Sequence, residues 1–167
     1  MIAALCLWSL LMSELAAITP ALMFKLLNYS VLPFWALLIF LPISKITDLL
    51  VHSVLAPILL GVIYAWLLAS AIYGAPPVPE GAGFSSLEGV AKLFSVERAL
   101  VAGWAHYLVF DLFIGAWEGR DAQRVGLNHF ILIPCLLLTL LVGPIGLLAY
   151  LIARGMAGRG GWSLFEG

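Results

Sequence analysis

The stretch Trp104–Phe130, WAHYLVFDLFIGAWEGRDAQRVGLNHF, decides how this chain is organised. Its first part is apolar enough to lie within a membrane helix. In a chain of which only 10% of the residues are charged, it gathers many of the ionisable and polar side chains: His106, Asp111, Glu118, Arg120, Asp121, Arg124, Asn128 and His129. Ionisable groups at membrane depth are costly, so their presence indicates function. The stretch therefore predicts both a membrane helix and the position of a functional site.

The composition of the whole chain predicts an integral protein of a lipid bilayer. The 167 residues are 63% hydrophobic, with a mean hydropathy of +1.11, whereas soluble proteins are roughly 45–50% apolar and about 25% charged. This length accommodates a few spans of about 20 residues and no separate soluble catalytic domain. The formal net charge is −1 and the basic residues form no stripe, so nucleic acid is excluded as a partner.

The predicted fold class is all-α: a polytopic helical membrane protein with a four-helix transmembrane core. Thr19 and Pro20 mark the start of the first span, because Thr caps helices and Pro is favoured in their first turn. Pro33 lies inside that span and predicts a kink. The four spans are expected at about residues 20–41, 53–73, 99–117 and 126–153.

Three regions of the chain follow from this pattern. Residues 19–154 are expected to form a single membrane domain, and residues 155–167 a flexible tail. Residues 1–18 are apolar with one charge, and form an N-terminal extension that is a short extra span, an interfacial helix or an over-long start. They make a poor signal peptide, because no basic residue precedes the apolar run.

Several local patterns refine the prediction. Ser85-Ser86-Leu87-Glu88 has the form of a capping box and opens a short surface helix that runs to Phe94. Residues 118–126 are interpreted as a tight polar turn. Small residues recur on one face of the second span, and again in the last, which would let helices approach closely and makes a homo-oligomer plausible: Gly61, Ala65, Ala69, and Gly143, Gly146, Ala149.

The basic residues predict an orientation. With four spans, five of them fall on the side of the two termini and three on the other: Lys25, Lys92, Arg98, Arg154 and Arg159 against Lys45, Arg120 and Arg124. Because cytoplasmic loops carry an excess of Lys and Arg, both termini are expected in the cytoplasm.

Helical spacing divides the opening stretch into faces. Trp104, Tyr107, Asp111 and Glu118 share one face of the third span, and Asp111 and Glu118 are about 10 Å apart along its axis. His106 lies about 140° from Asp111 and is expected to face another neighbour. A short turn would then bring the start of the last span close to Glu118.

General acid–base chemistry suits these residues, because a carboxyl group in an apolar environment can hold or release a proton near neutrality. The catalytic candidates are Asp111, Glu118, His129 and His106, with Asp111 first among them. The substrate-binding candidates are Trp104, Tyr107, Asn128, Arg120, Arg124 and Asp121. In the alternative interpretation Asp111 is a structural latch between helices, and the two arginines pair with Glu118 and Asp121.

A metal site is not expected. Three histidines are too few for a histidine-rich di-iron centre, and a mononuclear site would have to be made by His129, Glu118 and Asp121. No motif of a nucleophilic serine, such as G-x-S-x-G, is present.

Three segments resemble a known family. They are HYLVFDLFIGAWEGRDA (106–122), GLNHFILIPCLLLTLLVGPIGLLAYL (126–151) and TPALMFKLLNYSVLPFWALLIFLP (19–42). Together they are similar to the abscisic-acid-deficient-four-like membrane proteins, and the resemblance covers about Thr19 to Arg154. Its motif residues here are His106, Asp111, Glu118, Arg120, Asp121, Asn128 and His129.

The resemblance implies a carotenoid or related polyene ligand, because plant members are required for neoxanthin synthesis from violaxanthin in plastid membranes. The chain lacks the long transit peptide of plastid members, which indicates a bacterial inner membrane. The implied reaction converts an epoxide end group to an allene. This isomerisation is redox-neutral and needs an acid and a base but no cofactor. Two alternatives remain: a non-enzymatic carotenoid-binding factor that presents pigment to a partner membrane enzyme, and a small proton or ion transporter using Asp111 and Glu118.

Overall fold

The computed structural model describes residues 19–74, 76–161 and 163–164, so the predicted N-terminal extension lies outside the described residues. Every regular element in the described part is a helix, which confirms the all-α class. The helices are α2 (Pro20–Phe40), α3 (Lys45–Leu50), α4 (Leu55–Tyr73), α5 (Leu87–Phe94), α6 (Glu97–Val125), α7 (His129–Val142) and α8 (Pro144–Met156).

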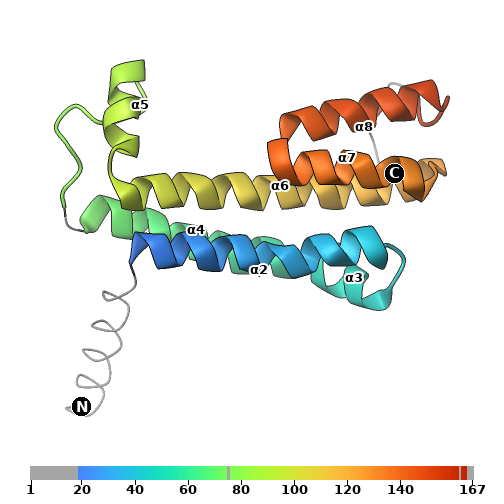
Figure 1. Ribbon diagram of the computed structural model, residues 1–167, viewed down its shortest axis with the longest axis horizontal. Helices are drawn as coiled ribbons and strands as arrows, with labels where there is room; N and C mark the ends of the chain where they lie inside the picture. The colour runs from blue at the N-terminus through green and yellow to red at the C-terminus, as the bar shows by residue number, and fades with distance from the viewer. Residues whose placement is uncertain (1–18, 75, 162, 165–167) are drawn as a thin grey trace, which may run out of the picture.

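Helix α6 is the axis of the molecule and packs against α2, α4, α5, α7 and α8 (Figure 1). Glycines make the closest of these approaches possible. A Cβ atom on Gly115 would lie 2.5 Å from the ring of Trp35 in α2, and one on Gly119 would lie 3.4 Å from Leu38. Trp35 is only 2% exposed. The small residues of α6 therefore allow a large aromatic side chain to be buried between the two helices.

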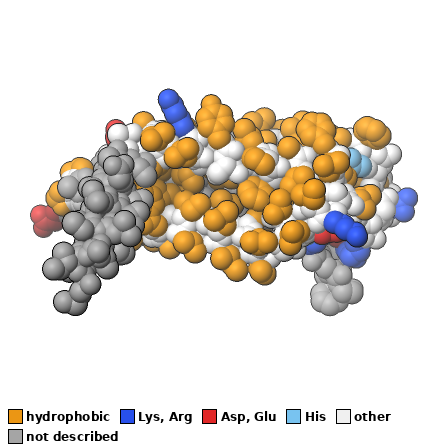
Figure 2. All heavy atoms as spheres, turned by 90° about the horizontal axis from the view of Figure 1, so that it is seen from below, with side chains coloured by type: hydrophobic (Ala, Val, Ile, Leu, Met, Phe, Trp, Pro, Cys, Tyr) orange, Lys and Arg blue, Asp and Glu red, His pale blue; other side chains and the backbone are white. Residues whose placement is uncertain are grey.

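Three helical segments are long and apolar enough to cross a membrane: Pro20–Phe40, Lys45–Tyr73, which combines α3 and α4, and Glu97–Val125. At 1.5 Å per residue, α2 is about 31 Å long, close to the roughly 30 Å of bilayer hydrocarbon. Figure 2 shows a largely hydrophobic surface between charged side chains that lie nearer the two ends. Three of the four predicted spans are thus present as long apolar helices.

The local signals at the helix ends are mostly confirmed. The Thr19 hydroxyl accepts a hydrogen bond from the backbone N–H of Leu22 (3.2 Å). Helix α2 continues through Pro33 without a break. The short helix after residue 85 is present as α5, with Ser86 rather than Ser85 as its cap (3.0 Å to Gly89 N). These caps satisfy backbone groups that a helix end leaves unpaired.

The prediction of a polar turn over residues 118–126 is wrong. Helix α6 continues to Val125 and ends at Gly126, whose φ of 66° is the left-handed conformation typical of a residue that follows a helix. The 29 residues of α6 are about 43 Å long. The charged side chains of its last two turns do not end the helix, because Glu and Arg are good helix formers.

The prediction of one bent helix over residues 126–153 is also wrong. The chain reverses at Gly143, where φ is 44°, and Pro144 starts α8. Helices α7 and α8 then lie side by side along the second half of α6, as a hairpin (Figure 1). Each is about 20 Å long, so neither is long enough to cross a bilayer. A Cβ on Gly146 would lie 2.0 Å from the backbone nitrogen of Thr139, which confirms close packing at this one of the second set of small residues.

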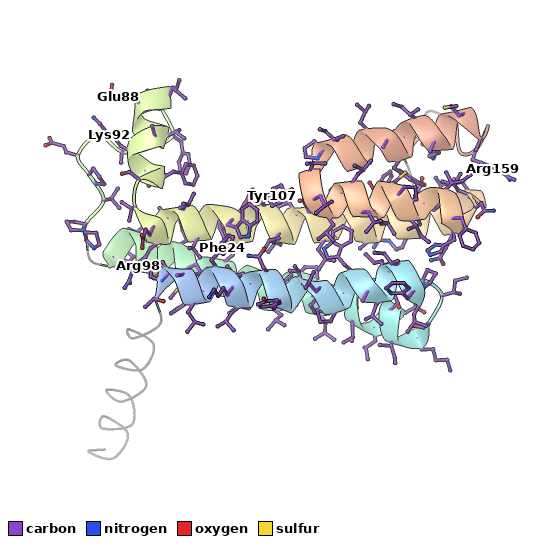
Figure 3. The ribbon with its side chains drawn as sticks, in the orientation of Figure 1. Phe24, Glu88, Lys92, Arg98, Tyr107 and Arg159 are labelled. Atoms are coloured by element: carbon purple, nitrogen blue, oxygen red, sulfur yellow. The ribbon has the colours of Figure 1, made fainter. Side chains whose placement is uncertain are left out.

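The reversal changes the expected orientation. Helix α2 begins at one end of the bundle and α8 ends at the other (Figure 1). Lys92 and Arg98 lie at the first end and Arg159 at the second (Figure 3). The inference that both termini lie in the cytoplasm depended on a fourth complete span, and that span is absent among the described helices.

The first set of small residues does not pack against another helix in the described part of the chain. Ala65 and Ala69 are exposed, and a Cβ on Gly61 would meet nothing within 4 Å. Helix α4 instead buries Ala56, Leu60, Leu67 and Ala71. The predicted packing face is therefore on the outside of the described bundle.

Candidate functional site

Glu118 is buried between α6 and the α7–α8 hairpin. Its side chain is 0% exposed, and the hydroxyl of Thr139 lies 3.0 and 3.1 Å from its two carboxyl oxygens. Thr139, also 0% exposed, has one proton to share between them. The contact holds α7 against α6 at the level where Gly146 brings α8 closest to α7.

Asp121 is the centre of a buried ionic network. Its Oδ1 accepts hydrogen bonds from Arg124 (Nη2 2.6 Å, Nε 3.2 Å). Its Oδ2 accepts one from the Tyr150 hydroxyl (2.6 Å) and lies 2.9 Å from Arg154 Nε, an ion pair without hydrogen-bond geometry. The sequence interpretation that Arg124 pairs with Asp121 is confirmed. The guanidinium group of Arg154 and the phenol of Tyr150 thus join α8 to the last turns of α6, and Arg124 pairs with Asp121 within α6.

Arg154 also holds part of the predicted tail. It is 3% exposed, and it donates hydrogen bonds to the backbone carbonyls of Gly160, Gly161 and Ser163 at 2.8–2.9 Å. The tail folds back over the guanidinium group at these residues. The position of Gly160, where a Cβ would lie 2.2 Å from Arg154 Nη2, leaves no space for a side chain.

Asp111 lies at the midpoint of α6, against the tip of the hairpin. A Cβ on Gly143 would be 2.6 Å from Asp111 Oδ1, so the glycine lets the backbone of the reversal approach the carboxyl group. Asp111 is 8% exposed. Within the described part of the chain its Oδ2 has no partner that meets hydrogen-bond geometry, and the hydroxyl of Tyr107, one turn earlier on α6, interacts with the carboxyl group. The structure therefore places the first catalytic candidate under the hairpin tip.

Trp104 contacts helix α2, and Tyr107 stacks on Trp104 along α6. Their rings stack with centroids 5.2 Å apart, and Trp104 also lies 5.4 Å from Phe24. Trp104 Nε1 donates to Asn28 Oδ1 (3.2 Å), a hydrogen bond between helices. Figure 3 shows Phe24 and Tyr107 on the facing helices α2 and α6. Trp104 therefore joins the two helices through Phe24 and Asn28.

The structure does not bring the two predicted catalytic histidines to the buried carboxylates. The His106 ring packs on Phe110 (4.5 Å) and Tyr64 of α4 (5.6 Å), which confirms that it faces a different neighbour from Asp111. His129 Nε2 lies 2.8 Å from the carbonyl oxygen of Ile39, at the end of α2. Asn128 caps α7 by accepting a hydrogen bond from Phe130 N (2.9 Å).

A groove of about 650 Å³ lies between α4 and α6 and is called the α4–α6 groove below. Its walls are mostly apolar. Three polar residues, His52, Ser53 and Arg120, belong to its lining, and of the predicted site residues it contains only Arg120. The other main lining residues are Ala56, Pro57 and Leu60 from α4, and Val109, Phe110, Leu112, Phe113 and Ala116 from α6.

Reasoning from the sequence missed four residues of these sites. Tyr150 and Arg154 of α8 contact Asp121 only because the chain reverses at Gly143, whereas Thr139 lies before the reversal and meets Glu118 because α7 runs back along α6. His52 lies in the short connection between α3 and α4, where it approaches Gly119 of α6: its Cε1 would be 3.5 Å from a Cβ there. The only signal for His52 was a lone histidine in a short polar connection between two apolar segments.

No group of three or more His, Cys, Asp or Glu side chains in the described part of the chain could hold a metal ion. The set His129, Glu118 and Asp121 in particular is divided. Glu118 and Asp121 face the hairpin, whereas His129 contacts the end of α2.

Comparisons with known proteins identify the family. Protein ABA DEFICIENT 4, chloroplastic, of Arabidopsis thaliana is 32% identical over 135 residues, which is 76% of this chain and 58% of the plant protein. The chain thus spans less than two thirds of that relative. No solved structure matches it. The model of the family described as ABA DEFICIENT 4-like matches residues 22–150, which include every described buried carboxylate, so this chain belongs to the ABA DEFICIENT 4-like family.

Proposed function

We propose that this protein lies in a bacterial inner membrane, takes part in carotenoid metabolism, and binds a carotenoid or similar polyene in the α4–α6 groove. The observation that carries the proposal is the groove itself, with its apolar walls and a few polar residues. Family membership and the resemblance to proteins of neoxanthin synthesis support the choice of ligand class.

The dimensions of the groove suit part of such a molecule. Its lining on α6 runs from Val109 to Arg120, about 16 Å along the helix axis. Ligand sites of about 300–1,000 Å³ with apolar walls and a few polar groups are typical of small-molecule binding. This length accommodates an end ring and the first part of a polyene, while the remainder of the chain would lie among the lipids.

The positions of the carboxylates favour binding over catalysis as the primary function. Neither Asp111 nor Glu118 lines the groove, because both face the α7–α8 hairpin. A polyene in the groove would instead meet His52 and Arg120. The protein would then hold or present its pigment to a partner membrane enzyme.

Filling the groove is expected to abolish pigment binding. Val109 is half-buried and lines the groove, so Val109→Trp would occupy its apolar part. The protein should be expressed in a bacterial host that accumulates epoxy-carotenoids and purified from the membrane fraction, and its visible absorbance measured. The wild type is expected to carry the banded absorption of a polyene, and Val109→Trp to lose at least about nine tenths of it.

Val62→Trp is the matched control, because Val62 is 64% exposed on α4 and does not line the groove. It should retain the pigment. A colourless wild type from a pigmented host, or equal pigment in all three proteins, would contradict the proposed function.

A second candidate function, cofactor-free isomerisation of an epoxide end group, is supported by Asp111. A buried carboxyl oxygen without a partner that meets hydrogen-bond geometry needs an explanation, and one explanation is that it exchanges a proton with a substrate or water. In this reaction Asp111 would act as the acid or the base, and Glu118, on the same face of α6, would supply the opposite role.

Asp111→Asn separates the two functions. If the protein is an isomerase, wild type should produce new allenic pigment in the same host. Asp111→Asn should lower the rate of this conversion by at least about 100-fold, since removal of an acid–base group typically costs 10²–10⁴-fold in rate. Asp48→Asn, on the exposed surface of α3, should retain full conversion. Pigment that is bound but chemically unchanged by wild type would rule out isomerisation of those substrates and leave the binding function.

A further inference from the structure

The contact between Glu118 and Thr139 contains one more close approach than the hydroxyl group alone can turn into a hydrogen bond. Both carboxyl oxygens of Glu118 lie within hydrogen-bond distance of the Thr139 hydroxyl oxygen, at 3.0 and 3.1 Å. A hydroxyl group has one proton and two acceptor lone pairs, whereas an ionised carboxylate has no proton to donate. A protonated carboxyl group can donate to the hydroxyl oxygen while its other oxygen accepts from it. The two short distances therefore fit a neutral Glu118.

The surroundings of Glu118 do not compensate a negative charge. Glu118 and Thr139 are both 0% exposed, and no ion pair of Glu118 occurs among the residues that the structure describes. An ionised carboxylate that is removed from water without a paired charge is so costly that the group takes up a proton instead. Burial and the hydrogen-bond pattern thus point to the same protonation state.

The charged groups on α6 and α8 that face this region have other partners or carry the wrong sign. Asp111 lies two turns before Glu118 on α6 and Asp121 one turn after it, and a second negative charge near either carboxyl group is unfavourable. Arg154 faces the region from α8, but its guanidinium group is paired with Asp121. Arg124 is paired with the same carboxylate.

The remaining titratable groups around Glu118 are weak acids or lie on another side of α6. Cys135 of α7 is buried, and its thiol donates to a backbone carbonyl one turn earlier. The Tyr150 hydroxyl of α8 donates to Asp121. His52 and Arg120 line the α4–α6 groove. None of these groups forms an ion pair with Glu118 in the described structure.

We infer that Glu118 is a neutral carboxylic acid in the folded protein, and that its proton is required for the α7–α8 hairpin to stay packed on α6. Loss of the proton leaves a buried negative charge that shares a single hydroxyl proton. Water relieves that charge only when α7 moves away from α6. The inference concerns the hairpin and holds whether or not the α4–α6 groove binds a pigment.

The position of Glu118 allows such an opening. Val125, the last residue of α6, lies seven residues further on, about 10 Å along the axis, so the contact is near one end of the bundle. Gly146 closes the other side, because a Cβ there would lie 2.2 Å from the Thr139 hydroxyl oxygen. Asp111 lies under the hairpin tip, so movement of the hairpin would also expose Asp111. The proton on Glu118 thus controls access to a second carboxyl group.

The direction of the pH dependence follows from where the proton is bound. The packed hairpin holds the proton of Glu118, and the opened hairpin releases it to water. Because the packed state binds more protons, raising the pH favours the opened state.

Infrared spectroscopy of the reconstituted protein tests the protonation state. The C=O stretch of a protonated carboxyl group is separate from the carboxylate and amide bands. Near neutral pH, wild type is expected to show such a band that Glu118→Gln lacks and Thr139→Val shifts. Glu88→Gln is the matched control and should keep the band, because the Glu88 side chain is 77% exposed on α5. A Glu118→Gln spectrum with the band unchanged would overturn the inference.

The thiol of Cys135 reports whether the hairpin is packed. Cys135 is 4% exposed and lies one turn before Thr139 on α7. Replacing the other cysteine, Cys6, with serine leaves it as the single thiol. Its rate of modification by a membrane-permeant maleimide is measured near neutral and at alkaline pH, in wild type and in Glu118→Gln. Comparison of the two proteins at each pH removes the ordinary increase of thiol reactivity with pH.

Glu118→Gln keeps both hydrogen bonds to Thr139 and is neutral at every pH, because an amide both donates and accepts. The two proteins should react equally slowly near neutral pH. At alkaline pH, wild type is expected to react at least about tenfold faster, since modification follows the population of the opened state. Equal rates at every pH would show that packing of the hairpin does not depend on this proton. Fast modification of Glu118→Gln near neutral pH would also contradict the inference, because a neutral side chain of the same shape should keep the hairpin packed.

Discussion

Replacing Asp121 with alanine is expected to lower the free energy of unfolding by about 3–5 kcal/mol, the typical cost of removing one partner of a buried ion pair. The substitution would leave Arg154, which is 3% exposed, without its carboxylate partner. Tyr150 would lose the acceptor of its hydroxyl. Arg124 is about one third exposed, so it can turn toward water and contributes less to the loss.

The measurement is equilibrium unfolding of the reconstituted protein by SDS, followed by far-UV circular dichroism. Glu88→Gln is the control, because it removes an ion pair of similar length with Lys92 (2.8 Å) on the surface of α5. Exposed pairs contribute about 0.2–1 kcal/mol. The double variant Asp121→Ala with Arg154→Met removes both charges and should recover part of the loss. Equal stability of Asp121→Ala and wild type would show that the network does not hold α8 against α6.

Gly146→Ala is expected to have the second large effect, a loss of about 3 kcal/mol or more. The added methyl group would lie 2.0 Å from the backbone nitrogen and 2.2 Å from the hydroxyl oxygen of Thr139. Overpacking alone costs typically 1–3 kcal/mol. Because backbone atoms cannot rotate away, α7 and α8 must separate, and Thr139 then moves from Glu118. A buried carboxyl group that loses its hydrogen bond adds about 1–3 kcal/mol.

Gly61→Ala is the matched control, since an added methyl group there meets nothing within 4 Å. In a helix interior this change is expected to stabilise by about 0.5–1 kcal/mol through helix propensity. The same SDS titration distinguishes the two variants, and hydrogen exchange of the backbone N–H of Thr139 localises the effect. A Gly146→Ala protein as stable as Gly61→Ala would mean that the hairpin is not packed at this glycine.

The long helices could be predicted because their signals are local. Thr19 and Pro20 start α2, Gly74 ends α4, and apolar runs of about 20 residues lie within each. The hairpin could not be predicted in the same way. Residues 126–153 are together long enough to span, and Gly143-Pro144 indicates a bend without giving its angle. The angle is set by contacts with α6 that are distant in sequence, chiefly those of Gly143 with Asp111 and of Tyr150 with Asp121.

In the candidate site, likewise, the contacts within one helix could be predicted, and those between distant segments could not. Helical spacing predicted that Asp111 and Glu118 face one way, and both do face the hairpin. Arg124 and Asp121 are three residues apart on one helix, and their pairing was also predicted. Tyr150 and Arg154 reach Asp121 only after the reversal. The α4–α6 groove depends on how two long helices diverge, and no periodicity within either one contains that information.

The half-length hairpin also has a consequence for how the protein is made. During synthesis a segment enters the bilayer alone when its apolar stretch is about 20 residues long, and α7 and α8 have 14 and 13 residues. In lipid, the polar backbone at Gly143 needs partners that only protein can supply. With the membrane placement proposed above, the long helices would be inserted first, and the hairpin would enter by folding onto α6. The last part of the chain would then fold onto a helix that is already in place, and Asp111, Glu118 and Asp121 are the α6 residues that it would contact.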